Sequence, residues 1–143
     1  MARTIPIIRL RRTLIVSIQI ELRDDLVVEL KDELAREMQR QDVDGLIIEV
    51  SGVDIIDTYI ARSIRDIGQV ARLMGVRTVL AGLDPGMATT LVDIGMVLHG
   101  VSTALNLEAA LDSFAEVRGD GGDRSELDEL LEWSKDEPPD TIY

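Results

Sequence analysis

Residues 46–50, LIIEV, constrain the fold more than any other stretch, because they form an almost uninterrupted aliphatic run. Such a run is typical of a central strand that is covered on both faces, as in a parallel sheet. Strand-like runs and helix-like patterns alternate along the chain in the order ββαβαβαβα. This order predicts an α/β fold with a mixed sheet, mostly parallel after an N-terminal β-hairpin, and about four helices that lie mainly on one side.

Five short apolar runs are predicted to form the strands: residues 5–10, 14–20, 46–50, 76–81 and 101–103. The second run alternates, which predicts a half-buried strand. Its two faces are Leu14, Val16, Ile18 and Ile20 on one side, and Ile15, Ser17 and Gln19 on the other. The tight connection Arg11-Arg12-Thr13 between the first two runs predicts the hairpin.

Four helices are predicted over residues 24–40, 58–74, 85–95 and 107–117. Asp24 and Asp25 supply capping side chains at the start of the first helix. Asp84 and Asn106 do the same just before the third and fourth helices. Gly75 suits the end of the second helix. The core stripe predicted for that helix is Ile60, Ile64, Ile67, Ala71 and Met74. Its predicted solvent face is Arg62, Ser63, Arg65, Asp66, Gln69 and Arg72.

Composition excludes several classes of function. The net charge of −12 argues against a nucleic-acid partner, which requires a basic face, and against an anionic membrane surface. The chain has no cysteine and one histidine, His99, so thiol chemistry and histidine metal clusters are excluded. Glycine-rich nucleotide motifs are also missing. We therefore expect no enzymatic activity, no cofactor and no metal. No apolar run reaches transmembrane length, and the N-terminal residues lack a signal-peptide core, so a cytoplasmic location is expected.

The last part of the chain differs from the rest in charge. Residues 117–143 hold three basic and nine acidic side chains, a net charge of −6, equal to that of the preceding 116 residues. We predict one domain over residues 1–117 and an acidic, mostly flexible tail over residues 118–143. Within the tail, residues 125–135 have the pattern of a short amphipathic helix, with Leu127, Leu130, Leu131 and Trp133 as its apolar residues. We interpret the tail as a solubilising spacer rather than an interaction element.

Asp57 and Thr58 lie at the junction between the central strand and the second helix. A helix N-terminus offers free backbone N–H groups and partial positive charge, which suit a phosphate. Simple capping of the helix is the alternative, and both can hold because a cap lies at the surface. Phosphate on Thr58 would add a charge of about −1.5 to −2 beside Asp54 and Asp57. An acidic or apolar partner would then bind on the order of 100-fold more weakly, whereas a partner that presents arginines could instead bind more tightly.

Further site residues are predicted around this junction. A second, weaker candidate for phosphorylation is Thr90, although it and Thr89 suit a role as ordinary helix-surface residues. The predicted contacts for a protein partner are Asp54, Ile56, Asp57, Tyr59 and Arg62.

The chain resembles the STAS-domain family of anti-sigma-factor antagonists, and within it the RsbS-type scaffold of the stressosome, over about residues 4–116. The resemblance rests on five segments: residues 5–10 (IPIIRL), 14–19 (LIVSIQ), 53–61 (VDIIDTYIA), 73–82 (LMGVRTVLAG) and 103–108 (TALNLE). The Asp-Thr junction alone would not be specific, but the five segments together are.

The resemblance implies a STAS fold and a non-catalytic scaffold that assembles with RsbR-type sensor paralogues in a large shell. It also implies that the scaffold sequesters an RsbT-type switch kinase, which leaves after phosphorylating the hydroxyl residue that follows the aspartate, here Thr58. An RsbX-type phosphatase resets the bacterial stress-signalling system. The single-domain scaffold usually carries serine at this position, so Thr58 is a departure from the family pattern.

Two other functions remain open from the sequence. One is a simple anti-anti-sigma factor, which binds an anti-sigma kinase directly and stays small. The other is an α/β module that binds a small molecule or a nucleotide.

Overall fold

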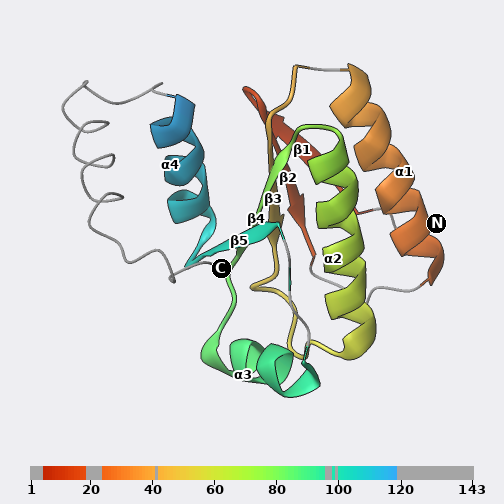
Figure 1. The fold of residues 1–143 in the computed structure, drawn as a ribbon, viewed down its shortest axis with the longest axis vertical. Coiled ribbons are helices and arrows are strands. Elements are labelled where there is room, and N and C mark those ends of the chain that lie inside the picture. The colour runs from red at the N-terminus through yellow and green to blue at the C-terminus, as the bar shows by residue number, and fades with distance from the viewer. Residues whose placement is uncertain (1–4, 19–23, 41, 96–97, 99, 119–143) are drawn as a thin grey trace.

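The computed structural model describes residues 5–18, 24–40, 42–95, 98 and 100–118. It confirms the order of elements expected from the sequence (Figure 1). The strands are β1 (Ile7–Leu10), β2 (Thr13–Ser17), β3 (Gly45–Glu49), β4 (Arg77–Ala81) and β5 (Val101–Ala104). The helices are α1 (Asp24–Arg40), α2 (Thr58–Leu73), α3 (Pro85–Ile94) and α4 (Leu107–Arg118). His99, Gln19 and Ile20 lie outside the described residues, as do residues 119–143, which contain nearly all of the predicted tail.

The five strands form one sheet in the order β1-β2-β3-β4-β5. β1 pairs with β2 antiparallel, and every other pair is parallel, as the sequence predicts. Arg11, in the turn between β1 and β2, has a φ of 55°. The parallel strands bring the carboxyl ends of β3 and β4 to the same edge of the sheet, and the loops that follow them position the candidate site.

Helices cover both faces of the sheet, so the expectation that they lie mainly on one side is only partly right. Figure 1 shows α1 and α2 on one face, α4 on the other, and α3 at the end where the parallel strands finish. The larger core lies under α1 and α2 and joins Leu14, Leu46 and Leu34, among others. The smaller core lies under α4 and joins Ile47, Val79 and Phe114.

The smaller core corrects the prediction that β2 is half-buried. Ile15 is only 7% exposed, because it belongs to the cluster that α4 covers on the second face of the sheet. Alternation along a strand separates its two faces but does not reveal whether another element packs on the second one.

Two residues of the second predicted helix do not lie where the sequence pattern placed them. Met74 is 39% exposed rather than buried, because it is the capping residue beyond the last turn of α2. Ser63 is 4% exposed rather than solvent-facing. It lies three residues after Ile60 and four before Ile67, and therefore shares their face of the helix. Its hydroxyl donates a 2.7 Å hydrogen bond to the carbonyl of Tyr59, which satisfies the polar group inside the core.

Candidate functional site

The loop from β3 to α2 is held in place by its own buried residues. The N–H of Val50 donates to the carbonyl of Ala81 at 2.9 Å, and the N–H of Val53 donates to the carbonyl of Val50 at 3.0 Å. Val53 and Ile56 insert into the core, with exposures of 9% and 2%. These contacts fix the backbone on both sides of Asp54, so the start of α2 is presented at a defined position.

Asp57 is the capping residue of α2, as predicted. Its backbone is extended, with φ −109° and ψ 178°, and its side chain accepts from the N–H of Ile60 at 2.8 Å. This bond satisfies one of the N–H groups that a helix N-terminus leaves without an intrahelical partner. The carboxylate of Asp57 is therefore occupied in orienting the first turn of the helix.

Thr58 is the first residue of α2, and it is exposed. The structure thus places its side chain at the surface, beside the positive end of the helix, as the sequence predicts. Its phosphorylation stays a prediction.

The residues around Thr58 present an acidic and apolar surface. Asp54, Asp57, Tyr59 and Arg62 are all exposed, in agreement with their predicted availability to a partner. The prediction that Ile56 contacts a partner is wrong, because its side chain is only 2% exposed and faces the core. Its neighbour Ile55, at 76% exposure, takes the outward position instead. The sequence offers two consecutive isoleucines in a loop, and no periodicity there indicates which one turns outward.

Helix α3 lies at the same end of the molecule as the first turn of α2 (Figure 1). Asp84 caps it by accepting from the N–H of Met87 at 2.8 Å. Thr90 is partly buried and donates to the carbonyl of Gly86 at 2.9 Å, whereas Thr89 is exposed and donates to that of Pro85 at 2.9 Å. Thr90 is therefore less accessible than Thr58.

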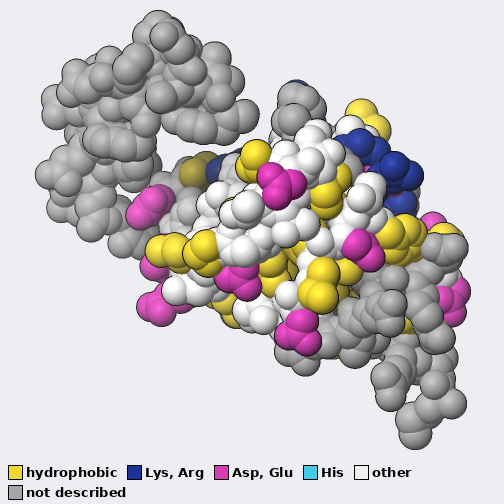
Figure 2. Space-filling view, turned by 90° about the horizontal axis from the view of Figure 1, so that it is seen from below, with side chains coloured by type: hydrophobic (Ala, Val, Ile, Leu, Met, Phe, Trp, Pro, Cys, Tyr) yellow, Lys and Arg dark blue, Asp and Glu magenta, His cyan; other side chains and the backbone are white. Residues whose placement is uncertain are grey.

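Viewed onto this end, the surface mixes hydrophobic and acidic side chains, with basic side chains gathered at one border (Figure 2). The exposed apolar side chains of this region include Ile55 and Val92, the latter 78% exposed. Such a surface suits a protein partner better than a nucleic acid, whose phosphates require a basic face.

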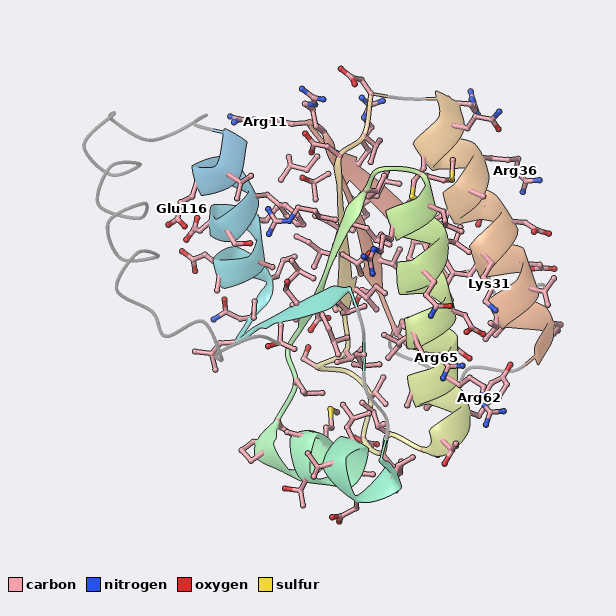
Figure 3. All side chains as sticks on the ribbon, in the orientation of Figure 1. Arg11, Lys31, Arg36, Arg62, Arg65 and Glu116 are labelled. Atoms are coloured by element: carbon pink, nitrogen blue, oxygen red, sulfur yellow. The ribbon has the colours of Figure 1, made fainter. Side chains whose placement is uncertain are left out.

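The flank of α2 that faces α1 carries charged side chains that pair with one another. Lys31 of α1 and Arg65 of α2 approach the carboxylate of Asp66 at 3.3 and 3.5 Å. Figure 3 shows Arg62 and Arg65 on the first turns of α2 and Lys31 on the adjoining helix. The pair of Lys31 with Asp66 joins α1 to α2 and so supports the helix that carries Thr58.

Two kinds of feature were not found among the residues that the structure describes. Within residues 5–18, 24–40, 42–95, 98 and 100–118, no three acidic, histidine or cysteine side chains gather as metal ligands would. Among the helices that the structure describes, none combines the length and apolar character needed to cross a bilayer.

Comparisons with known proteins agree with this architecture. The family model of the STAS domain matches residues 4–110. A structure of an RsbS variant from Moorella thermoacetica, in which a serine is replaced by glutamate, is 32% identical with a TM-score of 0.70, and the match covers 80% of this chain and 97% of that one. A chain from a structure of the stressosome, described as a signal integration and transduction hub, is 33% identical with a TM-score of 0.71, covering 79% and 98%.

Curated relatives match a shorter segment. The RsbT co-antagonist protein RsbRC of Bacillus subtilis is 35% identical over 74 residues, which are 52% of this chain. The match spans only 26% of the length of that relative, so the two proteins share a domain rather than a whole architecture. Because the STAS model matches most of its length, this chain belongs to the STAS-domain family.

Proposed function

We propose that this chain is a non-catalytic scaffold and antagonist of the stressosome type, which holds a switch kinase and releases it when Thr58 is phosphorylated. The observation that carries the proposal is the position of Thr58. It is an exposed hydroxyl residue at the start of a capped helix, in a chain about one-third identical to a stressosome RsbS over nearly all of that protein.

The electrostatics of the junction support release rather than recruitment. Phosphate adds a charge of about −1.5 to −2 to a surface that already presents the carboxylates of Asp54 and Asp57. A kinase that contacts Ile55 and Tyr59 through apolar groups would have to bury the new charge against them. Burial of an uncompensated charge is strongly unfavourable, so the phosphorylated site would lose its partner.

The scaffold part of the proposal rests on the comparisons. The relatives named for co-antagonism of RsbT are RsbR proteins, and the related structures include one of the stressosome. We infer that this chain assembles with RsbR-type sensor paralogues, that an RsbT-type kinase modifies it in a bacterial stress pathway, and that an RsbX-type phosphatase removes the phosphate.

The test is phosphorylation by an RsbT-type kinase with ATP, followed by mapping of the modified residue by mass spectrometry. We expect one phosphate on Thr58 and loss of labelling in Thr58→Ala. Thr89→Ala is the matched control, because it removes another exposed threonine hydroxyl from the same end of the molecule, and it should be labelled normally. Undiminished labelling of Thr58→Ala would reject this site.

A further inference from the structure

Helix α4 covers only part of its face of the sheet. It packs mainly on β3, β4 and β5, where Ile47, Val79 and Phe114 form the smaller core. Ile15 of β2 belongs to that same core and is only 7% exposed, so the covered region reaches β2. β1, about 4.8 Å further on, is the strand that extends beyond it. The uncovered part of this face therefore lies along β1, the edge strand of the sheet.

Two apolar side chains of β1 point onto this uncovered part. The register pairs Ile8 with Ile15, and Ile15 with Ile47, which places all three on the α4 side of the sheet. Leu10 lies two residues further along β1 and faces the same way. Nevertheless Ile8 is 56% exposed and Leu10 47% exposed. We refer to Ile8 and Leu10 as the β1 strip.

A pocket of about 150 Å³ lies at the same end of the sheet. It is lined by Asp44, Gly75, Arg77, Phe114 and Val117, the last of these in the final turn of α4. The row of paired residues from Leu10 leads through Thr13 and Gly45 to Arg77, so the pocket and the strip lie at one end of the sheet, three strands apart.

The end of the sheet beside Leu10 is rich in arginine. Arg11 and Arg12, in the turn after Leu10, and Arg77 are exposed there, whereas Arg9 lies on the opposite face of β1. Arg12 pairs with Asp42 and Asp44, at 3.2 Å in each case, and Arg77 lies over the ring of Phe114 at 5.5 Å. Figure 3 shows Arg11 at the same end of the molecule as Glu116 in the last turns of α4. With Asp42 and Asp44 paired to Arg12, this end of the sheet carries charges of both signs, and Arg11 and Arg77 are the basic side chains outside those pairs.

We propose that the C-terminal segment of the same chain, residues 119–143, docks on the β1 strip through the apolar residues of positions 125–135. The segment is the natural occupant because it continues directly from α4, whose last turn lines the pocket at that end of the sheet. Its charge is complementary, since the 27 residues from Val117 carry a net charge of −6. Leu127, Leu130 and Leu131 have helical spacing, so one apolar face could contact Ile8 and Leu10.

The linking residues are long enough for this arrangement. The eight positions 119–126 span up to about 26 Å when extended, well beyond the width of about 10 Å that β1 and β2 occupy. Docking would cover both the apolar strip and part of the edge strand β1, whose backbone is otherwise open to pairing with another chain.

Fluorescence tests this proposal directly, because Trp133 is the only tryptophan of the chain. We expect the emission of the full chain to lie at shorter wavelength than that of a synthetic peptide of residues 119–143, independently of protein concentration. Leu10→Asp should shift the emission to that of the peptide. Val28→Asp is the matched control, because Val28 is similarly exposed, at 58%, but lies on α1 across the sheet, and it should cause no shift.

A second variant keeps the test independent of any loss of folding. Arg11→Glu changes a residue of the turn and should shift the emission in the same direction, as should raising the salt concentration. Circular dichroism confirms that each variant remains folded. Emission of the full chain equal to that of the peptide would overturn the proposal, as would an equal shift in Val28→Asp. A shift that depends on protein concentration would overturn it in favour of a second copy of the chain as the occupant.

Discussion

At the scale of the residue, Asp57 has a structural role that can be separated from its charge. Its side chain accepts from the N–H of Ile60 at 2.8 Å, whereas Asp54 lies in the same loop and is exposed. Asp57→Ala should therefore lower the free energy of unfolding by about 1 kcal/mol. Asp54→Ala removes the same charge without removing the cap and should change it by less than about 0.5 kcal/mol. Urea denaturation measures both, and equal losses would contradict the capping role.

Thr58 allows a test of charge at constant size. Thr58→Glu adds a carboxylate at the first position of α2, where the helix dipole tolerates negative charge, so the protein should remain folded. If the proposed release is electrostatic, the affinity for the kinase should fall on the order of 100-fold. Thr58→Gln has nearly the same shape without the charge and should bind far more tightly than Thr58→Glu. Titration calorimetry compares the two, and equal weakening by glutamine would attribute the effect to size.

At the scale of the element, the contact between α2 and β5 depends on a residue without a side chain. A Cβ on Gly68 would lie 2.6 Å from Cγ2 of Val101, closer than real carbon atoms approach. Gly68→Ala should gain at most about 1 kcal/mol from helix propensity but lose about 1–3 kcal/mol through overpacking, a net destabilisation. Val101→Ala in the same chain removes the clashing methyl group, so the double variant should be more stable than the sum of the single effects predicts. Additive effects in a double-mutant cycle would exclude this contact as the cause.

At the scale of the whole molecule, the two functional proposals lie at opposite ends of the parallel strands. Thr58 follows the carboxyl end of β3, whereas Gly45 and Arg77, in the row that leads to the β1 strip, begin β3 and β4. Loss of the Trp133 signal would consequently leave the phosphorylation of Thr58 unaffected, and loss of phosphorylation would leave the Trp133 signal unaffected. The two proposals can fail independently.

Assembly is the property of the whole molecule that separates a scaffold from a simple antagonist. If the chain is a scaffold, mixing it with an RsbR-type paralogue should give a particle many times heavier than the 15.8 kDa chain. Light scattering after gel filtration measures this mass. A mixture that contained only monomers or dimers would contradict the scaffold function and favour direct binding of an anti-sigma kinase.

Local chemistry made most of the fold and part of the site predictable. Asp57, Asp84 and Asn106 each accept from the N–H group three residues later, at 2.8 Å, so capping preferences located three of the four helix starts correctly. The exposure of Thr58 follows from its place at one of these starts. The burial of Ile56 and exposure of Ile55 could not be derived in the same way, because a loop has no periodicity and its direction depends on which side chain finds space in the core.

The sequence by itself determined the order of the elements, the parallel sheet and the position of the phosphorylation candidate, because helix caps, glycine ends and apolar periodicity act within a few residues of the chain. Only the tertiary structure decided that Ile15 is buried by α4, that Ser63 belongs to the core, and that Ile8 and Leu10 remain uncovered. Each of these outcomes depends on which helix or strand packs on a given face. Such packing brings together residues that are far apart in the chain, and a local sequence pattern does not encode those contacts.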